Sequence, residues 1–168
     1  MNSSIYQYYV EGEDEKRIIE VLKTDMQLIK PGKVQVLNVV QERISDMKLR
    51  VLSEGTTLIF VFDADAGNPE ILSENIAKAL DAANVKEVHC ITQVKNLEDE
   101  IVRSTNIKKI EELFNSKNKG EFKKDLLRKR NVKQYLEAHS FDLSKFWSLD
   151  PPKPYERIKN EAEVVKLL

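Results

Sequence analysis

The chain has 168 residues, of which 41% are hydrophobic and 33% are charged, and its formal net charge at pH 7 is −1. This length suits one domain with a substantial apolar core, and the balanced charge singles out no class of partner. The single cysteine, Cys90, excludes an internal disulfide and is typical of a reducing compartment. No apolar run approaches the roughly 20 residues of a membrane span, and the N-terminus lacks the features of a signal peptide. We therefore expect a cytoplasmic protein that does not interact with a membrane.

Residues 5–92 alternate between strand-like and helix-like patterns. Aromatic and β-branched runs predict strands over residues 5–10, 34–40, 57–62 and 87–92. Apolar residues at helical spacing predict a helix that opens at Glu13, one over 42–53 and one over 69–83. The inward-facing side chains are expected to be Ile18, Ile19 and Leu22 in the first helix, Ile44, Met47 and Val51 in the second, and Leu72, Ile76, Ala79, Leu80 and Ala83 in the third. This order is typical of an α/β fold, with a mainly parallel four-stranded sheet and helices on both faces.

Beyond residue 95 the chain is expected to be helical. Helices are predicted over residues 105–115, 119–129, 131–138 and 155–167, with Pro151, Pro152 and Pro154 interrupting the pattern before the last. We therefore expect an α/β core over residues 1–104 and a helical, basic C-terminal part over residues 105–168 that packs on the same domain.

The stretch VFDADAGNPE, residues 61–70, joins a buried strand to two carboxylates, Asp63 and Asp65. Continuous apolar runs suit strands that are covered on both faces. Ligands of such sheets bind at the carboxyl ends of the strands. Two carboxylates at that place suit Mg²⁺, which prefers oxygen ligands. The alternative is a polar loop with an acid that caps the following helix.

Acidic residues follow three of the four predicted strands. They are Glu11 after the first strand, Asp63 and Asp65 after the third, and Glu98, Asp99 and Glu100 after the fourth. Because parallel strands end at the same edge of a sheet, these side chains are expected to converge. Converging carboxylates repel one another unless a cation or a proton lies among them. A divalent cation, Mg²⁺ or Mn²⁺, is the simplest explanation, and without one a carboxyl group should have a raised pKa.

Two segments resemble the motifs of the Toprim domain family. YYVEGEDEKRIIEVL is similar to the first motif, in which a strand is followed by Glu-Gly and a helix, and VFDADAG is similar to the Asp-x-Asp motif after a later strand. The resemblance covers roughly residues 5–100. Within the family, the segment QVKNLEDEIVRS is most similar to the acidic segment of OLD-family nucleases.

The resemblance implies a Toprim-like, Rossmann-like fold and Mg²⁺-dependent phosphodiester chemistry on nucleic acid. It makes Glu11 the general acid or base and makes Asp63 and Asp65 the metal-binding aspartates, all three being catalytic. Because the three side chains are expected to converge, Glu11 is expected to bind the ion as well. The extra metal ligand is Glu98 or Glu100, and we prefer Glu98. A nuclease is favoured over a topoisomerase, which needs a nucleophilic tyrosine normally supplied by another domain, and over a primase, which needs a larger apparatus. Carboxylate-bound Mg²⁺ stabilises charge on a phosphate, and a nearby free carboxylate can move a proton.

Positive charge is concentrated over residues 117–133, which contain eight lysines and arginines and only two acidic residues. A basic segment beside an acidic metal site is typical of nucleic-acid binding. The residues expected to contact phosphates of DNA or RNA are Lys119, Lys123, Lys124 and Arg128, with Lys95 as a further candidate. The alternative is a solvated helix face.

Two other functions fit part of the pattern. Haloacid-dehalogenase-type phosphatases also place Asp-x-Asp after a strand, but near the start of the chain, and they leave Glu11 and Gly12 unexplained. A non-catalytic Toprim-like module that binds nucleic acid or a protein is the second. OLD-family Toprim domains are commonly joined to an ATPase, and this sequence lacks a GxxxxGK[ST] loop. An ATPase on a separate chain is therefore the partner that this alternative suggests.

Overall fold

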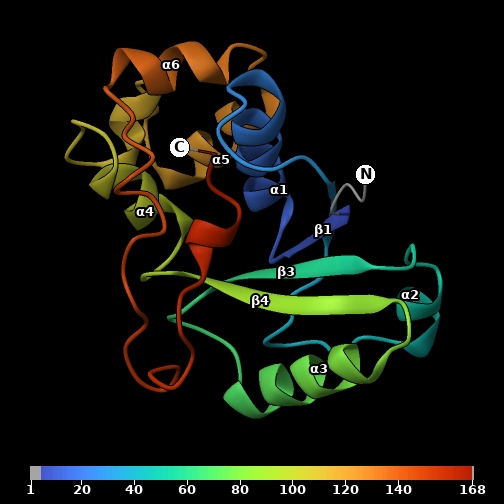
Figure 1. The fold of residues 1–168 in the computed structure, drawn as a ribbon. Helices are drawn as coiled ribbons and strands as arrows, with labels where there is room; N and C mark the ends of the chain where they lie inside the picture. Colours follow the sequence, from blue (N-terminus) through green and yellow to red (C-terminus); the bar gives the residue numbers. More distant parts are fainter. Residues whose placement is uncertain (1–4, 168) are drawn as a thin grey trace.

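The computed structural model describes residues 5–167 as an α/β fold around one parallel sheet (Figure 1). The strands are β1 (Ile5–Val10), β2 (Lys33–Val36), β3 (Thr56–Asp63) and β4 (Val85–Gln93). They lie in the order β2-β1-β3-β4, and all three pairings are parallel. The predicted α/β class and parallel four-stranded sheet are therefore confirmed, and the carboxyl ends of the strands share one edge.

Helices cover both faces of the sheet. The α-helices are α1 (Glu13–Glu20), α2 (Asp46–Arg50), α3 (Pro69–Asp81), α4 (Leu97–Arg103), α5 (Lys119–Arg128) and α6 (Val132–Ala138). A π-helix, η1 (Val21–Asp25), continues α1, and two short 3₁₀ helices are η2 (Ile110–Leu113) and η3 (Ala162–Val164). In Figure 1, α3 lies on one face of the sheet, whereas α1, α4, α5 and α6 lie on the other side. Within residues 5–167, no helix combines the length and the apolar character needed to cross a membrane.

Strand β3 is buried along its whole length and divides the core into two clusters. Ile59 and Val61 pack into the cluster that contains residues of α1, α4, α5 and α6. Phe60 and Phe62, which alternate with them, pack into the cluster against α2 and α3. This arrangement explains the continuous apolar run, because both faces of a covered strand need apolar side chains.

The second strand is shorter than the predicted 34–40. The backbone N–H of Leu37 still donates to Val10 O at 2.8 Å, but the chain then turns at Asn38, whose backbone oxygen accepts from the N–H of Gln41 and Glu42. Leu37 and the apolar residues after the turn are buried on the α3 side of the sheet. Burial of an irregular segment therefore produced the strand-like pattern.

The helix predicted over 42–53 is also shorter. It begins at Asp46 because Ser45 Oγ accepts from the backbone N–H of Lys48, which caps the first turn. Met47 and Val51 are 74% and 77% exposed, so their predicted inward orientation is wrong. Leu80 is likewise exposed, as is Ala83, which lies beyond the end of α3. Ile44, Leu72 and Ala79 are buried as predicted, and the buried residues that were not predicted are Leu49 in α2 and Asn75 in α3.

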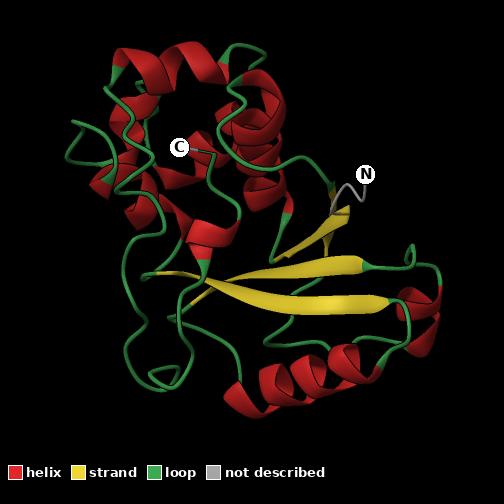
Figure 2. Ribbon diagram, viewed as in Figure 1, coloured by secondary structure: helices red, strands yellow, loops and turns green. Residues whose placement is uncertain are grey.

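In the C-terminal part, α5 and α6 confirm the predicted helices over 119–129 and 131–138. The predicted helix over 105–115 is wrong, because α4 starts earlier, at the cap formed by Asn96, and only the short η2 follows. The predicted final helix over 155–167 is also wrong. Figure 2 shows this stretch mostly as loop, with η3 as a single turn. The chain forms turns there instead, in which the N–H of Tyr155 donates to Pro152 O and the N–H of Ile158 donates to Tyr155 O.

Candidate functional site

The two sequence motifs meet at the carboxyl edge of the sheet. Glu11 follows β1 and Asp63 ends β3, and these strands are paired in parallel with Val10 opposite Val61. The backbone N–H of Asp63 donates to Glu11 Oε2 at 3.2 Å. Sheet pairing therefore brings together two acidic residues that are 52 positions apart in the sequence.

The loop after Asp63 is held by several contacts. Gly67 has a φ of +83°, and a Cβ atom on it would lie 2.2 Å from Val40 Cγ2 and 2.9 Å from the hydroxyl of Tyr155. That hydroxyl donates to Ala66 O at 2.7 Å. These constraints require glycine at this position, and the exposed Asp65 precedes it on the held loop.

Neither aspartate caps the following helix. Asn68 does so, because its side-chain oxygen accepts from the backbone N–H of Glu70 at 2.8 Å. The backbone N–H of Asp65 instead donates to Lys95 O at 3.2 Å, which ties this loop to the segment after β4. The capping interpretation of the two carboxylates is therefore wrong.

Helix α5 brings positive charge to the same edge. An open cavity of about 410 Å³ is lined by Asp63, Asp65, Asn96, Glu98, Lys119, Gly120 and Lys123. Lys123 Nζ lies 3.8 Å from Glu98 Oε1 and 3.7 Å from Asp14 Oδ2. Two lysines one helical turn apart thus share a cavity with three of the predicted carboxylates.

The carboxyl groups strongly affect one another. Burial, and then the negative charge of Glu11, raise the pKa of Asp63 to about 9. Burial also raises the pKa of Glu11, with smaller contributions from the charges of Asp65 and Glu98. In the absence of a cation, burial and mutual repulsion therefore favour the protonated forms of Asp63 and Glu11.

Glu15, which is not among the site residues predicted from the sequence, also belongs to this cluster. It is buried in the first turn of α1. Burial raises its pKa to about 7, and the charges of Glu11, Asp14 and Glu98 add to that effect. The available signal was its position four residues after Glu11, in the turn that begins directly after the Glu-Gly motif.

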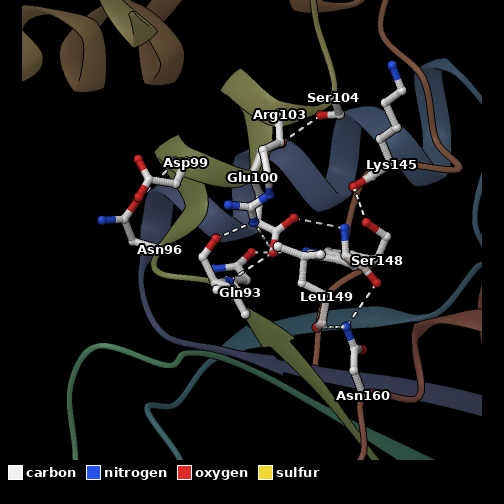
Figure 3. Close-up of polar contacts among 12 residues, drawn as sticks. Gln93, Asn96, Asp99, Glu100, Arg103, Ser104, Lys145, Ser148, Leu149 and Asn160 are labelled. Carbon is white, nitrogen blue, oxygen red and sulfur yellow. Dashed lines mark hydrogen bonds and ion pairs between the residues drawn. The ribbon is translucent and has the colours of Figure 1, made fainter. Parts of the chain in front are cut away.

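Glu100 does not line the cavity. It is fully buried, and its Oε1 accepts from the backbone N–H of Trp147 at 2.9 Å. Its Oε2 accepts from the N–H of Val94 at 2.8 Å and pairs with Arg103 Nη2 at 2.9 Å (Figure 3). Both carboxylate oxygens are thus occupied by structural partners, and of the two candidate extra ligands only Glu98 faces the cavity.

The basic residues predicted from the sequence separate into two groups. Lys119 and Lys123 line the cavity. Lys124 and Arg128 do not; they pair with acidic residues of α5 itself, and their side chains are 75% and 76% exposed. Lys95 is exposed on the loop after β4 and is not part of the cavity lining.

The donor set suits Mg²⁺ only in part. Among residues 5–167, no three His, Cys, Asp or Glu side chains are grouped as the ligands of one metal ion. Mg²⁺, however, is usually held by one or two carboxylates together with water and substrate phosphates. Asp63 and Asp65, which line one cavity, fit that kind of site, whereas a cage made wholly of protein ligands does not fit.

Comparison of the chain with models of protein families, with curated proteins and with solved structures gave no match. The function is therefore inferred from the residues of this site and their arrangement.

Proposed function

We propose that the chain is a Toprim-type, Mg²⁺-dependent enzyme that cleaves phosphodiester bonds in nucleic acid, most similar to OLD-family nucleases. The observation that carries this proposal is the 3.2 Å contact between Glu11 Oε2 and the backbone N–H of Asp63. It joins the glutamate of the first motif to the Asp-x-Asp of the second at the edge where parallel sheets bind ligands.

Asp63 and Asp65 would hold the ion, and Glu98, in the same cavity, is the next oxygen donor. When bound, Mg²⁺ or Mn²⁺ stabilises negative charge on the phosphate and on the leaving oxygen. Asp63 must release its proton to act as a ligand, because the coordinating form of a carboxyl group is the anion.

Glu11 is the residue that moves a proton in this proposal. Its pKa is raised by burial, so it holds a proton more readily than an exposed glutamate. A carboxyl group tuned in this way can take a proton from the attacking oxygen or give one to the leaving oxygen. Lys119 and Lys123, which line the same cavity, bind phosphate oxygens as compact positive charges.

The test is cleavage of labelled single-stranded DNA, double-stranded DNA and RNA with Mg²⁺ or Mn²⁺. We expect wild type to cut at least one of them and Asp63→Asn to cut none. The matched control is Asp81→Asn, because Asp81 is an exposed aspartate at the end of α3. A wild type that cuts none of these substrates with either ion contradicts the proposal.

One observation favours a non-catalytic alternative. Lys123 Nζ lies within 4 Å of Glu98 and Asp14, so a lysine already balances part of the negative charge without a metal. In this alternative the chain is a Toprim-like module that binds nucleic acid or a protein, with an ATPase on a separate chain as its partner. Binding of nucleic acid without metal binding or cleavage would favour this function over the nuclease.

A further inference from the structure

Gln93, the last residue of β4, contacts the central carboxylate of the proposed site. It lies opposite Asp63 in the parallel pairing of β3 and β4, and it is fully buried. Its Nε2 donates to Asp63 Oδ1 at 2.7 Å, and its Oε1 accepts from Trp147 Nε1 at 3.2 Å. Because the indole N–H can only donate, the amide oxygen must face Trp147 and the amide NH₂ must face Asp63.

Trp147 is itself held in place. Its backbone N–H donates to Glu100 Oε1 at 2.9 Å, and its carbonyl accepts from Asn160 Nδ2 at 2.9 Å. Its φ of +56° lies in the left-handed region, which residues other than glycine rarely adopt. Glu100 is fixed in turn by Val94 and Arg103 (Figure 3). An ordered chain of hydrogen bonds therefore runs from Glu100 through Trp147 and Gln93 to Asp63.

We propose that Gln93 is a positioning residue that orients the carboxylate of Asp63 for Mg²⁺, and that Trp147 and Glu100 keep Gln93 in the required orientation. This inference rests on the proposed function. With Oδ1 held by the amide, the direction of the Asp63 carboxylate is set before the ion binds. Partners that orient a ligand in this way typically change metal affinity by about 10- to 100-fold when they are removed.

The arrangement also makes the only tryptophan of the chain a reporter of the site. The indole is joined to Asp63 through a single side chain, Gln93. Binding of Mg²⁺ at Asp63 would change the charge on the oxygen that accepts from Gln93, and with it the polar surroundings of the indole. We therefore expect the fluorescence of Trp147 to change as Mg²⁺ binds, with the same dissociation constant that calorimetry gives.

The experiment compares Mg²⁺ binding by wild type and by Gln93→Met, followed by calorimetry and by Trp147 fluorescence. Methionine keeps the length of the side chain but removes both hydrogen bonds. We expect about 10- to 100-fold weaker binding and a smaller fluorescence response. Thr92→Val is the matched control, because Thr92 is the neighbouring buried residue of β4 and its hydroxyl has no partner among residues 5–167. It should bind Mg²⁺ as wild type does.

A second variant, Gln93→Asn, covers the case in which Gln93→Met does not fold, since it keeps the amide but cannot span both partners. Equal Mg²⁺ affinity in a folded Gln93 variant and in Thr92→Val would overturn this inference while leaving the proposed function intact. The inference is also overturned, with the proposed function intact, if wild type binds Mg²⁺ in the calorimeter without any change in Trp147 fluorescence. That measurement requires no variant. If wild type binds no Mg²⁺ at all, the proposed function fails, and this inference fails with it.

Discussion

Asp63 is a buried carboxyl group whose pKa is raised by its burial and by nearby acidic residues. Burial and the charges of Glu11, Glu15 and Asp65 raise its pKa, whereas the amide of Gln93 lowers it. The folded chain thus holds a proton on Asp63 more tightly than the unfolded chain does. Such a residue opposes folding when it is ionised, which is more typical of a functional site than of a stabilising contact.

The stability of the metal-free protein should therefore depend on pH with a definite sign. Because the pKa of Asp63 rises from 3.8 to about 9 on folding, its contribution to stability is full below 3.8 and is lost as the pH rises through about 9. We expect the melting temperature in a chelator to fall between about pH 5 and pH 9. The fall should be smaller in Asp63→Asn, which has no proton to lose. Equal slopes in the two proteins would contradict the raised pKa.

Replacing the buried carboxyl groups of Asp63 and Glu100 by amides should have different effects on the stability of the protein. Asp63→Asn makes permanent the uncharged form that burial and the charge of Glu11 favour, so it should leave the metal-free protein as stable as wild type, or more stable. Glu100→Gln should destabilise it by about 1–3 kcal/mol, because Glu100 accepts from Val94 and Trp147 and pairs with Arg103. Urea denaturation of both variants measures the difference. A similar loss of stability in both would mean that Asp63 is a structural carboxylate.

At the scale of elements, helix α5 presents its basic residues in two directions. Lys119 and Lys123, four positions apart, lie on the side of the cavity. Lys124 and Arg128, also four positions apart, lie outside it and pair within the helix. The two pairs carry the same charge, so they form a matched comparison within a single helix.

Neutralising each pair separately should distinguish phosphate binding from solvated charge. Lys119→Gln with Lys123→Gln should weaken nucleic-acid binding and lower the salt-dependence slope by about 2, roughly one unit for each lysine that binds a phosphate. Lys124→Gln with Arg128→Gln should have a smaller effect on both. Binding assays over a series of salt concentrations give the slopes. If the two double variants behave alike, the cavity-facing lysines have no special role.

Some elements could be predicted from the sequence because one cause dominates their pattern. Strand β3 is buried on both faces, and α5 and α6 begin directly after Asn118 and Asn131. The segment after β2 could not be predicted, because buried irregular chain and buried strand both require apolar residues. Likewise, the side chains of α2 that face the core depend on the residue at which the helix begins. That start is set by the Ser45 cap and could not be predicted from the apolar spacing.

The same reasoning explains how much of the candidate site was predictable. Glu11, Asp63 and Asp65 could be grouped because strand ends share an edge in a parallel sheet. To predict that Glu98 faces the cavity and Glu100 does not, one must know where α4 begins, because that sets the direction of each side chain. The helix begins directly after its Asn96 cap. Gln93 could not have been found, because an amide at the end of a strand has no sequence pattern that marks it as a partner of Asp63.

At the scale of the whole molecule, the C-terminal segment supports the site from outside the sheet. Trp147 contacts Gln93, and the hydroxyl of Tyr155 donates to Ala66 O in the Asp-x-Asp loop. Glu161 then accepts from the N–H of Cys90 and pairs with His89 of β4. In Figure 1 this segment runs beside the end of β4 and returns toward the helical side. The chain after α6 therefore contributes a contact that helps hold the loop that carries Asp65.

Removing one of these hydrogen bonds should loosen that loop. Tyr155→Phe loses the hydrogen bond to Ala66 O but keeps the aromatic packing on Phe62, whose ring centre is 5.2 Å away. We expect a loss of roughly 1 kcal/mol and faster amide hydrogen exchange over residues 64–67. Tyr135→Phe is the control, because Tyr135 packs on Phe114 in the other core cluster and its hydroxyl accepts from Lys129 Nζ. Unchanged exchange in residues 64–67 of Tyr155→Phe would argue against this support.

The measurement that tests the central claim most directly is calorimetric titration of wild type and Asp63→Asn with Mg²⁺ and with Mn²⁺. The account predicts that wild type binds at least one of the ions at millimolar concentration, more tightly at higher pH as Asp63 loses its proton. It predicts that Asp63→Asn, though folded and no less stable, binds neither. No binding by wild type, or equal binding by the two proteins, would contradict the assignment of these carboxylates to a metal site.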